Sequence, residues 1–353
     1  MTSDNNILVI NPGSTSTKLA IFQNTTQCKA ETINHSSSEL HQYPSLWEQF
    51  PFRLKICREW ASRYVKECSA VVSMGGLFRP MPGGVYKVTD KMRSDARKNL
   101  QGEHASNLGC ELAYTIASNY QAPAFIVDPV SVDEFEPLAY YSGHPMIKRR
   151  SLSHALNIHA AARHAATELK IPLYNSSFII AHIGGGISVA PVRNGKIIDV
   201  NDAASDGPFS PERTGGLPLQ QFIGLCFSGK YTEAEMRKFV MGKGGLAAYL
   251  GTNSVIEVEQ KINAGDTAAR EIYQAMAYQI AKEIGAMATV LEGKVNAVVL
   301  TGAIARSEMF TTWIMERVQF LAPVIIFPGE DEMRALAEGA LRVLQGQEQY
   351  KEY

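Results

Sequence analysis

Residues 7–22 read ILVINPGSTSTKLAIF, with two apolar runs on either side of a turn made of small and hydroxyl-bearing residues. This pattern predicts a β-hairpin. Residues 178–192, FIIAHIGGGISVAPV, have the same design with three glycines at the turn. The two turns lie about half of the 353-residue chain apart, which suggests two related α/β domains that arose by duplication. Any α/β protein can contain two glycine-turn hairpins, so the repetition alone leaves that alternative open.

The rest of the chain alternates between helix and strand patterns. Apolar residues spaced by three or four from Ile272 to Met287 predict a helix over 267–291. A helix is also expected over 151–169, beginning at Ser151. The remaining expected elements are strands at 295–300 and 324–327 and helices near 307–321 and from after Gly329 to about Leu344. This order predicts an α/β fold with helices covering a mixed sheet, and a tight crossover between domains around 130–150.

The amino-acid composition argues against a nucleic-acid-binding, membrane-spanning or disulfide-rich protein. Lys and Arg number 34 against 35 Asp and Glu, a net charge of −1, which provides no basic surface for nucleic acid or an anionic membrane. The five cysteines contain no C-x-x-C pair, which argues against a disulfide framework or a zinc site and suits a reducing compartment. Residues 1–10 lack a basic region, and no apolar run has the length of a membrane span. We therefore expect a cytoplasmic protein.

Three small-residue turns follow apolar strands. The first, at 13–18, is not a Walker A loop, because Thr17 rather than Gly precedes Lys18 and Leu19 follows it. Its main-chain N–H groups and hydroxyls can hold phosphate oxygens, and an ordinary Ser/Thr turn is the alternative. Gly184–Gly186 and Gly302 supply the other two turns. Together the three turns predict one polyphosphate site between the domains.

Longer segments resemble the acetate/butyrate kinase family, and its butyrate kinases in particular. They are ILVINPGSTSTK (7–18), GEHASNLG (102–109), RRSLSHALN (149–157), AHIGGGISV (181–189), GPFSPERTGGLP (207–218), GKGGLAAYLGTN (242–253) and PGEDEMRALAEG (328–339). The family lies within the actin, Hsp70 and sugar-kinase superfamily. The resemblance implies two duplicated ribonuclease-H-like domains with an ATP cleft between them. The first would span 1–135 plus about 335–353, and the second 136–334.

The resemblance also implies an activity. The expected reaction is direct in-line transfer from ATP to butanoate, giving butanoyl phosphate and ADP, with Mg²⁺ and in a homodimer. A carboxylate is already ionised at neutral pH, so no general base is required. Two alternatives stay open: a kinase for isobutyrate, propionate or acetate, and a nucleotide-binding relative without phosphotransfer. The partner is a small carboxylate in every kinase version.

Residue roles carried over from the family fall into three sets. The catalytic set is Arg213, His154, Asp128 and Asn11. The nucleotide and phosphate set is Ser14, Ser16, Lys18, His182, Gly184, Gly185, Gly186, Gly302 and Ala303. The metal set is Asp128, Asp331 and Glu332, with Glu330 in the same acidic run. A guanidinium fork matches the equatorial oxygens of a phosphoryl group in transfer.

Each of these roles has an ordinary alternative. Arg213 could form a surface ion pair with Glu212, Asp128 could be a turn residue before Pro129, and the acidic run could simply open a helix. His154, His159 and His164 are spaced by five, which places neighbours about 140° apart around a helix and argues against a shared zinc site.

The sequence also departs from the family pattern at the acceptor end. Met74 stands where butyrate kinases have Arg, and Val71 where acetate kinases have Arg. Arg79 or Lys87 could substitute for the missing cation. On the nucleotide side, Ala303 replaces a glycine and Ser254 an acidic residue.

Overall fold

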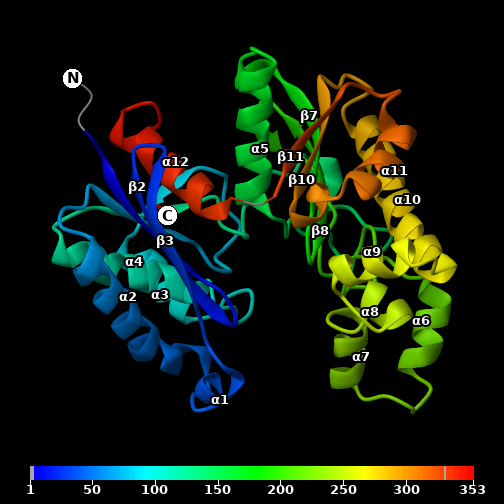
Figure 1. The fold of residues 1–353 in the computed structure, drawn as a ribbon, viewed down its shortest axis with the longest axis horizontal. Helices are drawn as coiled ribbons and strands as arrows, with labels where there is room; N and C mark the ends of the chain where they lie inside the picture. Colours follow the sequence, from blue (N-terminus) through cyan, green and yellow to red (C-terminus); the bar gives the residue numbers. More distant parts are fainter. Residues whose placement is uncertain (1–3, 330) are drawn as a thin grey trace. The chain divides into compact units, whose positions relative to one another are not determined.

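The computed structural model describes residues 4–329 and 331–353, so the expectations for residues 1–3 and for Glu330 lie outside the described residues. The chain divides into two compact units. Unit 1 contains residues 1–133 and 331–353, and unit 2 contains residues 134–330. Each unit has its own sheet with helices packed on it (Figure 1), which confirms the predicted α/β class.

The sheet of unit 1 has the strand order β3-β2-β1-β4-β6-β5. Strands β1 (Asn6–Pro12), β2 (Ser16–Gln23) and β3 (Thr26–Asn34) form an antiparallel meander. Strands β4 (Ala70–Met74) and β6 (Ala124–Val127) continue the sheet parallel to β1, and β5 (Val85–Lys87) pairs antiparallel with β6. The predicted first hairpin is confirmed, with Pro12 opposite Thr17 beside the turn. The carboxyl ends of β1, β4 and β6 therefore meet at one edge of the sheet.

Two helices cover the faces of this sheet. Helix α4 (Asn107–Asn119) packs on the face that presents Leu8, Ile10 and Val71. Helix α12 (Glu332–Leu344) returns from the far end of the chain to β1, β4 and β6. It packs closely, because a Cβ at Gly339 would lie 2.6 Å from Cγ1 of Val127. Helices α2 (Phe50–Tyr64) and α3 (Asp90–Arg97) pack against α4, and α1 (Ser37–Leu40) and the 3₁₀ turn η1 (Leu46–Gln49) precede α2.

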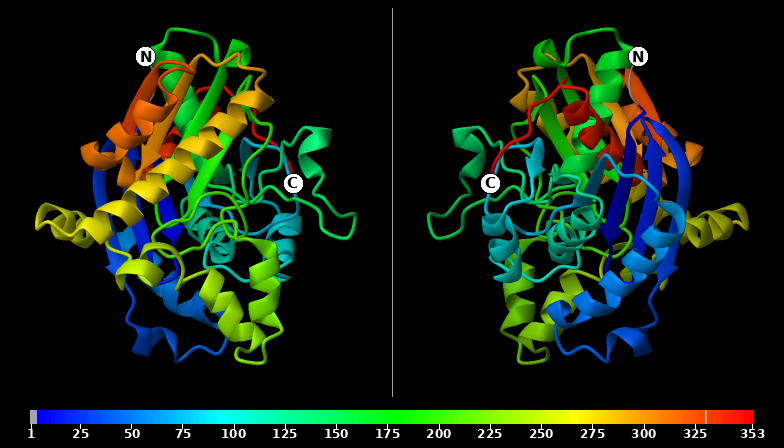
Figure 2. Two further views of the ribbon diagram at one scale, coloured as in Figure 1. Left: turned by 90° about the vertical axis from the view of Figure 1, so that its right-hand side faces the viewer. Right: turned by 90° about the vertical axis from the view of Figure 1, so that its left-hand side faces the viewer.

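The sheet of unit 2 has the order β11-β10-β7-β8-β9. Strands β7 (Ser177–Ile183) and β8 (Ile187–Arg193) form the predicted second hairpin, and β9 (Lys196–Ile197) extends it. Strands β10 (Ala297–Gly302) and β11 (Val324–Pro328) run parallel to β7. Helix α10 (Thr267–Val290) runs obliquely over β7 and β8 (Figure 2), and α5 (Ala155–Glu168) packs on β7 and β10.

The remaining elements of unit 2 are short. They are η2 (Pro137–Tyr140), η3 (Leu173–Asn175), α6 (Leu219–Cys226), α7 (Glu233–Val240), α8 (Gly245–Leu250), α9 (Val255–Asn263), η4 (Ala303–Arg306) and α11 (Glu308–Val318). Over the residues described, no helix is both long and apolar enough to cross a bilayer. All five cysteines are free thiols.

One expected boundary is wrong. The helix expected from Ser151 begins four residues later, at Ala155, with His154 as the capping residue in a non-helical conformation. The backbone N–H of His154 donates to Ser188 Oγ at 3.4 Å, and the Ser151 and Ser153 side chains are buried. These tertiary contacts hold residues 151–154 outside the helix, against their local preference.

Candidate functional site

The first candidate feature is the turn between β1 and β2, which contains Ser14 and Ser16. It is closed by a hydrogen bond from the Gly13 N–H to the Ser16 carbonyl at 2.8 Å. Ser14 and Thr15 are exposed, and their N–H groups have no acceptor in the described parts of the chain. The turn therefore presents unused main-chain donors and hydroxyls at the carboxyl end of β1, a suitable arrangement for binding an anion.

Three predicted residues come together beside this turn. The Asn11 amide Nδ2 donates to Glu332 Oε2 at 2.8 Å, and Lys18 Nζ lies 3.8 Å from the same oxygen. Glu332 reaches Asn11 because it begins α12, which packs across β1. The structure thus joins a predicted catalytic residue, Asn11, and a predicted phosphate-binding residue, Lys18, to a predicted metal ligand.

The other two predicted metal ligands have different surroundings. Asp331 caps α12, accepting the Arg334 N–H at 3.0 Å and pairing with Arg334 Nε at 3.0 Å. Asp128 follows β6 with a φ of +40° and is 1% exposed. Its Oδ1 accepts the Gly84 N–H at 2.6 Å. Asp128 therefore lies at the same sheet edge as Asn11, in a fixed and buried position.

No group of three or more His, Cys, Asp or Glu side chains in the described ranges has the arrangement of a metal site. Mg²⁺ does not require such a group, because it commonly takes one or two carboxylates together with water and substrate phosphates. Glu332 meets that need, since its side chain is 21% exposed and the Asn11 amide lies beside it. The residues present fit a hydrated Mg²⁺ ion at this edge of unit 1.

The Met74 region is built by close packing. A Cβ at Gly76 would lie 2.1 Å from Asn107 Oδ1, which accepts the Leu77 N–H at 2.8 Å. The cations considered as substitutes for the missing arginine both have partners. Arg79 Nε lies 3.1 Å from Asp95 Oδ2, and Lys87 Nζ lies 5.7 Å from the centre of the Tyr350 ring.

In unit 2, four predicted residues converge at the β7–β8 turn. The rings of His154 and His182 stack with centroids 4.2 Å apart, and His154 Nδ1 lies 2.9 Å from Ser188 Oγ. Gly186 faces them, because a Cβ there would lie 2.5 Å from Arg213 Nη1 and 3.2 Å from His154 Cε1. The missing side chain at Gly186 is what lets Arg213 approach the histidine pair.

The electrostatics of this cluster are set by burial. Burial lowers the pKa of His154 to about 4, with the positive charge of Arg213 acting in the same direction. Burial, and then His154, hold the pKa of His182 well below its usual range. Burial also lowers the pKa of Arg213, although a guanidinium stays charged in proteins. At neutral pH the cluster is one cation beside two neutral imidazoles.

Arg213 is held in place by hydrogen bonds that do not use all of its guanidinium N–H donors. Nη1 donates to the Ala203 carbonyl at 2.9 Å, and the Arg213 backbone N–H donates to Ser210 Oγ at 3.2 Å. Within the described residues, the buried Nε has no hydrogen-bond partner. The alternative interpretation, a surface ion pair with Glu212, has no matching contact of Arg213 in the described residues. An arginine held in this way is suited to an anionic ligand with more than one oxygen.

A cavity of about 590 Å³ opens beside this cluster in unit 2. Gly302, with a φ of +97°, packs so closely on β7 that a Cβ would lie 2.4 Å from the Ile183 carbonyl oxygen, and this contact fixes η4 as one wall. The lining residues are Gly184, Gly185, Pro211, Glu212, Asn253, Ser254, Val255, Ile256, Glu259, Ala303, Ile304, Arg306 and Ser307. The volume lies within the usual range for small-ligand sites, about 300–1,000 Å³.

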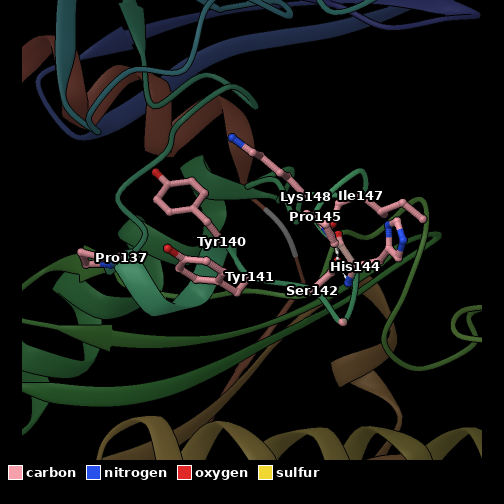
Figure 3. Close-up of a pocket in the computed structure, with 9 residues that line it drawn as sticks. Pro137, Tyr140, Tyr141, Ser142, His144, Pro145, Ile147 and Lys148 are labelled. Atoms are coloured by element: carbon pink, nitrogen blue, oxygen red, sulfur yellow. Dashed lines mark hydrogen bonds between the residues drawn. The ribbon is translucent and has the colours of Figure 1, made fainter.

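A second hollow, of about 570 Å³, lies over residues 137–148. Figure 3 shows Tyr140 and Tyr141 on one side of it and His144 on the other. The Tyr140 ring packs against Phe135 at a centroid distance of 5.3 Å. None of the residues that line this hollow was singled out from the sequence.

Three contributors to the site were missed from the sequence. Ser188 contacts His154, and Ser210 links Arg213 to the Gly185 carbonyl, to which its Oγ donates at 2.7 Å. Arg53 is buried beneath the Gly13–Ser16 turn. A polar residue inside the apolar β8 run was the available signal for Ser188. No sequence signal marks Arg53 as a buried residue, because an arginine in a helix usually lies on the surface.

Comparison with known proteins gives a consistent result. The sequence profile described as "Acetokinase family" matches residues 137–325. A "Probable butyrate kinase" of Listeria monocytogenes is 51% identical over 351 residues, covering 98% of this chain and 99% of the relative. "Butyrate kinase 2" of Clostridium acetobutylicum is 50% identical over 352 residues, covering 98% and 99%.

The fold is also found among solved structures. The acetate kinase of Porphyromonas gingivalis matches with a TM-score of 0.80 at 17% identity, covering 96% of this chain and 100% of that one. At this identity the match shows a shared fold.

Proposed function

The chain belongs to the acetokinase family, and we propose that it is an ATP-dependent short-chain carboxylate kinase with butanoate as its main acid. The sequence identity of 50–51% to butyrate kinases over nearly the whole chain supports transfer of a phosphoryl group to a carboxylate. The observation that carries the chemistry is Arg213, a half-buried cation set against two neutral imidazoles, whose Nε has no hydrogen-bond partner in the described residues. This arrangement suits a phosphoryl group whose negative charge is spread over several oxygens.

In this reaction a carboxylate oxygen of the acid forms a bond to the γ-phosphorus of ATP. The bond from that phosphorus to the β,γ-bridging oxygen breaks, and ADP leaves with the electron pair. The carboxylate is ionised at neutral pH, so no residue has to remove a proton. The protein contributes by positioning the reactants and by stabilising charge.

The roles assigned to individual residues follow from their surroundings. Arg213 stabilises the equatorial oxygens of the transferred group, and His154 and His182 donate hydrogen bonds as neutral imidazoles. The Gly13–Ser16 turn with Asn11 and Lys18 binds phosphate oxygens in unit 1. Asp128, buried at the same sheet edge, completes the polar end of that site.

The cofactor and nucleotide sites complete the proposal. Glu332, with Asn11, would hold Mg²⁺, which neutralises phosphate charge when bound. The 590 Å³ cavity in unit 2, lined in part by Gly184, Gly185 and Ala303, would take the nucleoside of ATP. Gly186 and Gly302 directly adjoin these lining residues in the chain. Ala303 replaces a glycine of the family pattern and lines this cavity directly.

We also propose a cytoplasmic homodimer that associates through unit 2. Helix α6 has no buried residue, and apolar side chains at its two ends are widely exposed, Leu219 at 71% and Phe227 at 86%. Exposed apolar groups of this kind commonly mark a protein interface. Light scattering on the purified protein tests the dimer.

The function is tested by trapping acyl phosphate as the hydroxamate. ATP, Mg²⁺ and one of acetate, propionate, butanoate, isobutyrate or valerate are supplied to the enzyme. We expect turnover to peak at four carbons despite Met74, which leaves the acceptor end without its usual cation. Faster turnover of acetate would overturn the choice of acid. ATP binding without product from any acid would favour a nucleotide-binding protein that has lost phosphotransfer.

A further inference from the structure

The buried guanidinium of Arg53 supports the first phosphate turn from beneath. Arg53 lies on α2 and is 0% exposed. Its Nη1 donates to the carbonyls of Gly13 at 2.9 Å and Ser16 at 3.0 Å, and its Nη2 donates to the Ser14 carbonyl at 3.3 Å. One side chain therefore fixes three of the four peptide carbonyls in the turn.

The charge of Arg53 has no acidic partner in the part of the chain that the structure describes. Nε and Nη2 donate to Gln49 Oε1 at 3.1 and 3.0 Å, and Nη1 also lies 3.2 Å from Thr17 Oγ1. All acceptors of this guanidinium in the described residues are neutral. Burial lowers the pKa of Arg53, but a guanidinium remains protonated. A buried cation without a counter-ion is unfavourable, unless a bound anion supplies the missing charge.

The direction of these hydrogen bonds determines what the turn presents to solvent. In a trans peptide the N–H points opposite to the C=O. Because the carbonyls of Gly13 and Ser14 point toward Arg53, the N–H groups of Ser14 and Thr15 point away from it. These are the two N–H groups that have no acceptor in the described chain. The other flank is held by His35, whose N–H donates to the Thr15 carbonyl at 2.8 Å.

We propose that Arg53 is a positioning residue for phosphoryl transfer. It holds the turn so that the N–H groups of Ser14 and Thr15 face the phosphate, and it places a positive charge behind them. This inference rests on the proposed kinase function, because the turn is taken to bind the transferred group. Arg53 itself does not touch the substrate.

The kinetic test compares Arg53→Met with Arg93→Met. Arg93 is a matched control in the same unit, where it binds the buried Glu111 through Nη2 at 2.7 Å and Nε at 3.0 Å, away from the turn. We expect Arg53→Met to lower kcat about 100-fold while KM for ATP and for butanoate changes less than about threefold. Arg93→Met should lower the Tm and leave kcat within about threefold of wild type. A folded Arg53→Met protein with wild-type kcat would overturn the proposal.

Arg53→Lys covers the case in which the methionine variant does not fold. Lysine keeps the charge, but one ammonium cannot reach all the acceptors of a planar fork. We expect a loss of kcat of about tenfold, smaller than in Arg53→Met. Wild-type kcat in Arg53→Lys would contradict the positioning role.

Hydrogen exchange measured by mass spectrometry separates this inference from the function itself. We expect faster exchange over residues 11–19 in Arg53→Lys than in wild type or Arg93→Met, with or without turnover. A wild-type protein that phosphorylates no acid would contradict the proposed function. Unchanged exchange over 11–19 in the lysine variant would contradict the role of Arg53, whatever the activity.

Discussion

His154 and His182 stack with ring centroids 4.2 Å apart and ring planes inclined by 27°. They belong to different elements, one capping α5 and the other in β7. Because burial and the Arg213 charge lower the pKa of His154, and burial with His154 lowers that of His182, both rings are neutral at neutral pH. Protonating His154 would place a new cation against Arg213, and protonating His182 would place one against His154, so the cluster has a specific dependence on pH.

The first prediction concerns stability at acid pH. Both histidines have a lower pKa in the folded state than the value of about 6.5 expected after unfolding. The unfolded chain therefore binds more protons below that value, and stability falls as pH drops from about 6.5 toward the folded pKa of His154, about 4. Tm measured against pH should fall less steeply in this window for His154→Asn and His182→Asn than for wild type. Identical slopes would show that the pair is not held neutral.

The second prediction concerns Arg213. We expect Arg213→Ala to lower kcat by about 10³–10⁵, as for arginines that stabilise a phosphoryl group in transfer. Arg213→Lys should also lose activity, because an ammonium cannot replace the fork. Arg237→Ala is the control, since Arg237 forms an exposed ion pair with Glu233 on α7. Hydroxamate formation measures all three, and retention of activity in Arg213→Ala would remove Arg213 from the chemistry.

The third prediction uses two glycines of unit 2. A Cβ at Gly186 would lie 2.5 Å from Arg213 Nη1, so Gly186→Ala should displace the guanidinium and lower kcat about 100-fold. A Cβ at Gly285, inside α10, would meet no atom within 4 Å. Gly285→Ala should therefore stabilise the helix by about 0.5–1 kcal/mol and leave kcat unchanged. Equal kcat in the two variants would mean that the Arg213 position has no influence on the reaction.

The fourth prediction separates two neighbouring carboxylates. Glu332 contacts Asn11 and Lys18, whereas Asp331 caps α12. We expect Glu332→Gln to raise the Mg²⁺ concentration needed for half-maximal activity about tenfold, because one ligand charge is lost. Asp331→Ala should cost about 0.5–2 kcal/mol of stability with little change in the Mg²⁺ requirement. The opposite pattern would assign the metal to Asp331.

Sequence patterns predicted those parts of the fold that depend on neighbouring residues. Both hairpins, and the run of alternating elements from α10 to α12, follow from local periodicity, and their boundaries fall within a few residues of the expected ones. The insertion of β4 and β6 beside β1 depends on pairing over long sequence separation, which no local pattern encodes. The start of α5 was misplaced for the same reason, since Ser188 on β8 holds His154 outside the helix.

For the site too, residues in local motifs were predictable from the sequence, and residues placed by long-range contacts were not. Residues in recognisable motifs, such as Arg213, Gly186 and Asn11, were named from the sequence, and the structure places each of them in a polar cluster. Arg53 could not be found, because its importance comes from burial beneath a turn about 40 residues earlier in the chain. Asp331 and Glu332 looked equivalent in sequence, and only the helix cap distinguishes them.

The return of residues 331–353 to unit 1 affects how the protein is made. When residue 133 leaves the ribosome, the first sheet still lacks α12, whose buried Leu336, Ala337 and Ala340 cover one of its faces. All of unit 2 must be synthesised before that helix emerges, a delay of about 10–40 s at about 5–20 residues per second. During translation the apolar face of the nascent first sheet is open to chaperones and to other unfinished chains. Slower elongation within the second half of the message should therefore increase aggregation of the newly made protein.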